Sequence, residues 1–178
     1  MDKDLLILVD EHDRETGTMN KLEAHRQGLL HRAFSVLISN SSNELLIHQR
    51  ATGKYHSGGL WTNTCCSHPM PGENTLDAAH RRLQEEMGFD CELHPAFQFI
   101  YRVELDNDLT EHELDHVFTG VSDAIPYPDS SEVAAYRWIA LPALLQEIQE
   151  EPGQFTHWFK LILHTYADKL DFNMISHP

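Results

Sequence analysis

Residues 72–88 read GENTLDAAHRRLQEEMG, and this stretch predicts an amphipathic helix. Asn74 is suited to cap its first turn, and Gly88 is suited to end its last turn. The apolar residues recur at helical spacing, at Leu76, Ala79, Leu83 and Met87. The pair Glu85–Glu86 lies near the C-terminal end, where the helix dipole disfavours anions. A solvated face explains such a pair, and a function such as Mg²⁺ binding explains it as well.

Strands are expected on both sides of this helix. Apolar or alternating stretches predict them at 5–9, 33–39, 44–49, 97–105, 113–121 and 134–139. The polar residues 40–43 predict a hairpin turn. Further helices are expected at 141–150 and 155–169. This order, without regular strand–helix repetition, predicts an α+β fold with one domain over residues 1–178.

Three segments are expected to be irregular. Residues 11–17 are polar and turn-like, and 21–30 are expected to form an ordered loop. Residues 51–72 are rich in glycine and proline and predict a long, loop-rich segment. Long loops in compact domains are often functional, so this last segment is the first place to look for chemistry.

Composition limits the classes of function. The formal net charge is −15, which disfavours binding to nucleic acid. An anionic substrate would need a local group of cations or a metal. The chain has no apolar run long enough for a membrane span, and the run at 5–9 is too short for a signal peptide. Three cysteines, two of them adjacent, argue against a disulfide framework, so a cytoplasmic location is expected.

Residues 61–69 read WTNTCCSHP and place Cys66 two residues before His68. A thiol and an imidazole in a loop can form a nucleophilic pair, a metal site or a proton-transfer site. A small buried thiol beside an unrelated histidine explains the same residues, and composition does not separate these alternatives.

A metal site is a second possibility. His25, His31 and His68 supply enough imidazoles if the fold gathers them, although the chain holds 13 histidines and most need no role. On a strand, Glu111 and Glu113 would share one face, with His112 on the other. Water usually solvates such a carboxylate pair. Together with the three histidines, the pair would instead suit Mn²⁺, Zn²⁺ or Mg²⁺.

Three basic residues precede the Cys66 loop or lie near His25. Lys21, Arg50 and Lys54 are each an ordinary surface cation when taken alone. Arg50 and Lys54 are close enough in sequence to Cys66 to offset the negative net charge for a phosphorylated ligand.

Taken together, these segments resemble the type I isopentenyl-diphosphate isomerases of the Nudix superfold. The resemblance runs in order over roughly residues 5–165 and is most specific in 61–69, whereas the helix at 72–88 indicates only the superfold. It implies a Nudix-like mixed β-sheet core flanked by helices. It also implies a small-molecule substrate, isopentenyl or dimethylallyl diphosphate, no nucleic-acid or membrane partner, and a monomer or weak homodimer.

The resemblance further implies a role for each matching residue. The residues matching the metal ligands are His25, His31, His68, Glu111 and Glu113. Cys66 and Glu113 match two acid–base groups on opposite faces of the substrate, with Glu113 as proton donor and Cys66 as base. Tyr101 matches a tyrosine that hydrogen-bonds the catalytic glutamate, and Trp158 matches a tryptophan over a carbocation. Glu86 matches a ligand of the Mg²⁺ that binds the diphosphate. The matching diphosphate-side cations are Lys21, Arg50, Lys54 and Arg82.

The sequence departs from the hydrolase box of the superfold, Gly-x5-Glu-x7-Arg-Glu-x-x-Glu-Glu-x-Gly. Ser67 stands at the first glycine, and Arg82 replaces the first glutamate of the Arg-Glu pair. That glutamate is one of the carboxylates that hydrolases use for metal-assisted attack by water. The isomerases commonly depart here too, so the change favours an isomerase over a pyrophosphohydrolase. A hydrolase would need neither Cys66 nor Trp158. A metal-binding regulatory or storage domain, the third alternative, leaves the acid–thiol pair unexplained.

Overall fold

A computed structural model describes residues 4–54, 56–105, 107–165 and 167. In these ranges nine strands form one mixed sheet: β1 (Leu5–Val9), β2 (Glu15–Asn20), β3 (His31–Ser39), β4 (Glu44–Arg50), β5 (Trp61–Thr62), β6 (Cys65–Ser67), β7 (His94–Glu104), β8 (Thr110–Val121) and β9 (Val133–Ala140). The helices are α1 (Lys21–Gln27), α2 (Thr75–Met87), α3 (Leu141–Glu150) and α4 (His157–Thr165), with a 3₁₀ turn, η1 (Pro152–Gln154). No helix within these ranges is long and apolar enough to cross a membrane.

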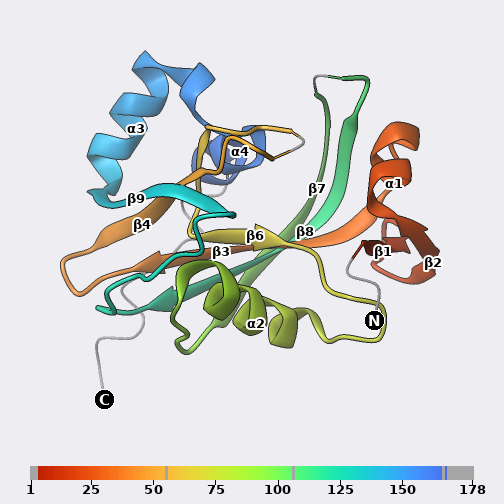
Figure 1. Ribbon diagram of the computed structural model, residues 1–178, viewed down its shortest axis with the longest axis horizontal. Coiled ribbons are helices and arrows are strands. Elements are labelled where there is room, and N and C mark those ends of the chain that lie inside the picture. Colours follow the sequence, from red (N-terminus) through yellow and green to blue (C-terminus); the bar gives the residue numbers. More distant parts are fainter. Residues whose placement is uncertain (1–3, 55, 106, 166, 168–178) are drawn as a thin grey trace.

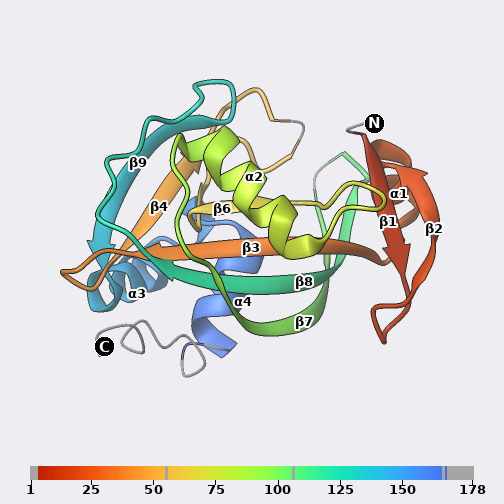
Figure 2. The same cartoon turned by 90° about the horizontal axis from the view of Figure 1, so that it is seen from below.

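Strand β3 is the centre of the sheet. It runs parallel to β8 and antiparallel to β1 and β6, while β8 forms a long hairpin with β7. Strand β4 pairs antiparallel with β5 and β9. Helix α2 covers one face of the sheet, and α3 and α4 lie on the other (Figure 1; Figure 2). The mixed sheet flanked by helices confirms the predicted α+β fold.

The core follows from the alternation of side chains along β3. Phe34, Val36 and Ile38 are buried on the face covered by α2, where they join Leu83 and other residues of that helix. Leu37 points to the opposite face and belongs to the cluster that α3 and α4 complete. Because successive side chains of a strand point to opposite faces, one strand serves both layers.

Helix α2 forms as its sequence predicts. The Asn74 side chain accepts a hydrogen bond from the Leu76 backbone N–H at 2.9 Å, and Gly88 ends the helix in the left-handed region at φ 76°. A side chain at Gly88 would also collide with the Tyr127 carbonyl. Glu86, near the end of the helix, is only 4% exposed, so the solvated-face explanation does not apply to it.

The structure corrects the expectations for 21–30 and 11–17 and refines those for 51–72 and 155–169. Residues 21–30 are not a loop, because Lys21–Gln27 form helix α1, capped by Asn20 and ended by Gly28. The predicted turn at 11–17 contains the start of β2. The segment 51–72 is loop-rich as predicted and also contains the short strands β5 and β6. The predicted helix at 155–169 is observed over His157–Thr165, and residues 166, 168 and 169 lie outside the described part of the chain.

The expected β3–β4 hairpin is present, but the two strands pair only next to the turn. The paired residues are Ser39 and Leu45, after which the two strands separate. The Thr64 hydroxyl spans the gap, since it accepts from the Ile38 backbone N–H at 2.9 Å and donates to the Leu46 carbonyl at 2.7 Å. The separation lets β6 pair with β3 and brings Cys66 opposite Ser35 in the sheet.

Candidate active site

A cavity of about 130 Å³ lies where these strands separate. Its lining comes from α1, β3, β4, the loop after β4, β6, α2, β7, β8 and α4. The predicted site residues that line it are Lys21, Arg50, Lys54, Cys66, His68, Arg82, Glu86, Tyr101, Glu111, Glu113 and Trp158. His25 and His31 are fully buried, and their Nε2 atoms lie 3.4 Å from Glu111 Oε1 and 3.5 Å from Glu113 Oε1.

Strand β8 presents the two carboxylates to the cavity. Glu111 and Glu113 are buried on one face, as predicted for residues i and i+2, and His112 on the other face bonds the Gly28 carbonyl. Glu113 Oε1 lies 3.5 Å from His31 Nε2 and 2.9 Å from His68 Nε2. Each carboxylate therefore has imidazole nitrogens around it.

Helix α1 and its connection to β3 orient the buried imidazoles. His25 Nδ1 lies 2.6 Å from the Lys21 carbonyl, and His31 Nδ1 lies 2.9 Å from the Leu29 carbonyl. Each Nδ1 accordingly donates a proton to a carbonyl, and each Nε2 is directed at the carboxylates. This arrangement explains why a short helix precedes β3.

Hydrogen bonding holds the carboxylates in their charged form. Burial raises the pKa of Glu113, but the nearby His31 and the hydrogen bond from Tyr101 outweigh burial and bring the pKa to about 2. The Tyr101 hydroxyl donates to Glu113 Oε2 at 2.7 Å and lies 3.2 Å from Glu111 Oε2. Burial and the two carboxylates raise the pKa of Tyr101 well above its usual range, so it stays protonated.

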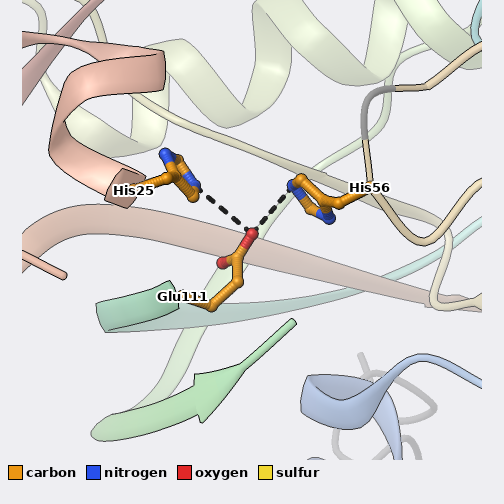
Figure 3. A group of neighbouring side chains, drawn as sticks. All are labelled: His25, His56 and Glu111. Atoms are coloured by element: carbon orange, nitrogen blue, oxygen red, sulfur yellow. Dashed lines mark ion pairs between the residues drawn. The ribbon is translucent and has the colours of Figure 1, made fainter. Parts of the chain in front are cut away.

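The donor set fits a divalent metal. Two groups of three donors within 4.8 Å of one another occur in the described residues: His25, His31 and Glu113, and His25, His56 and Glu111 (Figure 3). Within the same residues, the buried Nε2 of His31 makes no hydrogen bond, as an unused metal-binding lone pair would. Imidazole and carboxylate donors together are typical of Mn²⁺, Zn²⁺ and related ions.

Cys66 belongs to the part of the lining formed by β6 and α4. Arg50 Nη1 lies 3.8 Å from its sulfur. Burial raises the pKa of the Cys66 thiol to about 12 although Arg50 opposes the shift. The cysteine is therefore a thiol, not a thiolate. Cys65 is fully buried in the cluster beneath α2 and is a packing residue.

Trp158 is held by a residue to which the sequence assigned no role. Its indole Nε1 donates to Asn63 Oδ1 at 3.2 Å, and Asn63 in turn donates to the backbone carbonyls of Val36 and Cys65. The Arg50 guanidinium lies 5.5 Å from the centre of the Trp158 ring. The 61–69 stretch thus fixes both the thiol and the aromatic wall.

A charged network forms another part of the lining. Arg82 forms ion pairs with Glu86 and Glu132, and Lys54 pairs with Glu132. Burial raises the pKa of Glu86 despite the attraction of Arg82. Glu132, immediately before β9, has no signal in the sequence because only the fold brings it to the cavity.

Buried His48 makes the stability of the fold depend on pH. Burial, with Arg50 nearby, lowers the pKa of His48 from 6.5 to about 4. The unfolded chain therefore binds a proton below pH 6.5 that the folded chain binds only near pH 4. We expect a stability contribution that is complete above pH 6.5 and falls by about 3 kcal/mol by pH 4. Urea unfolding at both pH values should show a smaller loss for His48→Gln, and an equal loss would contradict the assignment.

Comparisons with known proteins point in one direction. The NUDIX domain family matches residues 29–159. A Pectobacterium atrosepticum protein named isopentenyl-diphosphate Delta-isomerase is 56% identical over 163 residues, covering 92% of this chain and 91% of its own. A Burkholderia multivorans protein of the same name is 53% identical over 158 residues, covering 89% of this chain and 90% of its own.

Solved structures agree on the fold. A Deinococcus radiodurans protein superposes with a TM-score of 0.72 at 20% identity, covering 91% of this chain and 99% of its own. A MutT NUDIX hydrolase from Burkholderia pseudomallei gives a TM-score of 0.62 at 17% identity, covering 80% and 98%. At these identities the likeness concerns the fold alone.

Proposed function

Because the chain belongs to the isopentenyl-diphosphate Delta-isomerase family of NUDIX proteins and interconverts isopentenyl and dimethylallyl diphosphate, we propose how its residues carry out that reaction. The reaction protonates one carbon of an alkene and removes a proton from another. An alkene is a weak base, and the resulting tertiary carbocation reacts readily with water. The site must supply a positioned acid, a positioned base and a dry cavity.

The two proton-transfer groups are Glu113 and Cys66. They lie on strands β8 and β6, which pair with β3 from either side, and both side chains line the same cavity. This placement is the single observation that carries the proposal. It lets one group act on each face of a substrate held between them.

We assign Glu113, assisted by Tyr101, as donor to isopentenyl diphosphate and Cys66 as acceptor. A pKa of about 12 for Cys66 and about 2 for Glu113 describe a protonated thiol and a charged carboxylate. After isopentenyl diphosphate is converted to dimethylallyl diphosphate, the proton is on Cys66 and Glu113 is charged. The reverse reaction starts from this same distribution. Each forward turnover must then be followed by return of the proton to Glu113.

The tightly held metal would be bound by His25, His31, His68, Glu111 and Glu113. When bound, a divalent ion supplies positive charge that acidifies the carboxyl of Glu113. The set of nitrogen donors favours Mn²⁺ or Zn²⁺ over Mg²⁺. The indole of Trp158 faces the same cavity and stabilises a carbocation without acting as a nucleophile, by about 1–2 kcal/mol.

The diphosphate would bind at the charged network of Glu86. Lys21, Arg50, Lys54 and Arg82 line this cavity in a chain of net charge −15, so the cations gather where the anion must bind. A Mg²⁺ held by Glu86 would accompany the diphosphate. Binding energy from this end of the substrate holds the alkene in place.

A product assay tests the function. The protein is incubated with isopentenyl diphosphate and Mg²⁺, with and without chelator, and both dimethylallyl diphosphate and free phosphate are measured. We expect dimethylallyl product that disappears with chelator. Phosphate release without that product would instead indicate a pyrophosphohydrolase.

Glu86→Gln tests the separation of the two metal sites. Among the described residues, Glu86 pairs with Arg82 and forms no ion pair with the imidazole cluster. We therefore expect KM for substrate at limiting Mg²⁺ to rise at least about tenfold while the tightly held metal is kept. Metal analysis of the purified variant and titration of activity with Mg²⁺ measure the two effects. Equal loss of both metals would show that the sites are not separate.

A further inference from the structure

His56 contacts the carboxylate cluster but matches none of the roles assigned above. It lies on the loop between β4 and β5, and its side chain is 7% exposed. Its Nε2 is 2.9 Å from Glu111 Oε1, the same oxygen that lies 3.4 Å from His25 Nε2. Figure 3 shows the Glu111 carboxylate between the two imidazole rings.

These three donors have the spacing of a metal site. His25, His56 and Glu111 place one nitrogen or oxygen each within 4.8 Å of the others. Donors at about 2.1 Å from a transition metal lie roughly 3 to 4 Å apart, so a small contraction closes the group around one ion. His25 also belongs to the group with His31 and Glu113, which joins the two halves of the cluster.

We propose that His56 is a ligand of the tightly held divalent metal, giving a set of four histidines and two glutamates; this inference rests on the metal centre proposed above. The sixth donor comes from the loop that also carries Lys54. The metal and the diphosphate-binding cation are therefore tied to one segment.

The surroundings of His56 hold its ring in a ligand's orientation. Its Nδ1 lies 3.3 Å from the Ser57 hydroxyl, which leaves Nε2 for the cluster. The ring packs edge-on against Trp158, with 6.3 Å between centroids. Arg50 Nη2 donates to the His56 carbonyl at 3.4 Å. A ligand fixed in this way loses little conformational entropy when it binds a metal.

Six protein donors suit this reaction better than five. Catalytic metal sites that activate water keep one coordination position open. A centre filled by side chains leaves no position for water, which a carbocation would otherwise meet. A fourth imidazole also strengthens the preference for Co²⁺, Ni²⁺ and Zn²⁺ over Mg²⁺.

Metal release tests the inference. Wild type, His56→Ala, His56→Gln and the control His80→Ala are loaded with Zn²⁺, freed of excess metal, and mixed with a chromogenic chelator. His80 suits as control because it forms a similar pair with Asp90, at 2.7 Å, on the outer surface of α2. We expect His56→Ala and His56→Gln to release zinc at least about tenfold faster than wild type, with His80→Ala unchanged.

Cobalt spectra provide a second readout, in which the imidazole is replaced by another metal ligand instead of being removed. In His56→Cys loaded with Co²⁺, the introduced thiolate should bind the metal and add a sulfur-to-cobalt charge-transfer band that the wild-type spectrum lacks. A histidine that only hydrogen-bonds Glu111 predicts no such band.

The outcomes separate the two proposals. If wild type retains no zinc, the metal centre fails and the inference falls with it. If wild type retains zinc and His56→Ala releases it at the same rate, only the role of His56 is overturned. If His56→Gln retains zinc as well as wild type does, His56 acts only as a hydrogen-bond donor. A Co²⁺ spectrum of His56→Cys without the new band would lead to the same conclusion.

Discussion

Replacing Cys66 with alanine is expected to lower kcat for isopentenyl diphosphate by about 10³-fold or more, while metal content stays at the wild-type level. The loss follows because alanine can neither accept nor return a proton, and positioned acid–base groups contribute up to about 10⁴-fold. Within the described part of the chain, the sulfur forms a hydrogen bond with Arg50 and none with an imidazole, so the metal cluster should persist. The rate of dimethylallyl product formation and the metal content of the purified variant measure the two effects.

Cys91 provides the matched control for this experiment. It is a free, half-buried cysteine that lies outside the cavity lining. Cys91→Ala should keep wild-type kcat and metal content. Activity of Cys66→Ala within tenfold of wild type would rule out a proton-transfer role for the thiol.

Replacing Glu113 with glutamine is expected to lower kcat at least as much as Cys66→Ala does, and it should also weaken metal binding. The amide cannot donate an acidic proton and is a poorer ligand, and it disrupts contacts with His31, His68 and Tyr101. The combination of lost turnover and lost metal distinguishes this variant from Cys66→Ala. Turnover assays at saturating metal separate the chemical loss from the binding loss.

Glu104 is the control carboxylate, because it is exposed at the end of β7 and lies outside the cavity. Glu104→Gln should be indistinguishable from wild type. Full activity of Glu113→Gln at saturating Mn²⁺ would show that Glu113 serves only as a metal ligand.

The sequence predicted the long elements because their patterns are strong. Helix α2 has an apolar face, a capping Asn74 and a terminating Gly88, and each acts within a few residues. Strand β2 was missed because nearly all of its residues are exposed, so it has no alternation of apolar and polar side chains. Strands β5 and β6, of two and three residues, are too short for any periodicity.

Helix α1 could have been found from its ends. Asn20 and Gly28 are suitable caps on either side of a seven-residue segment. Its body contains no clear apolar face because His25 is buried there for a reason other than hydrophobicity, namely its contact with Glu111. A functional residue in the core thus obscured the pattern that would have revealed the helix.

The candidate site was predictable only in part. Resemblance drew attention to residues that the fold does place around one cavity, from Lys21 to Trp158. It assigned no role to His56, Asn63 or Glu132, whose roles depend on contacts between segments far apart in sequence. Such contacts have no local pattern, so they become visible only when the sheet is assembled.

The Thr64 hydroxyl between the separating strands has a consequence for how the protein unfolds. Enzymes often carry their reactive residues on loops that open without disturbing the scaffold. Here the segment with Cys66 supplies hydrogen bonds that join β3 to β4, so it cannot detach while the sheet remains intact. Loss of activity and loss of secondary structure should follow a single cooperative transition in denaturant, with coincident midpoints.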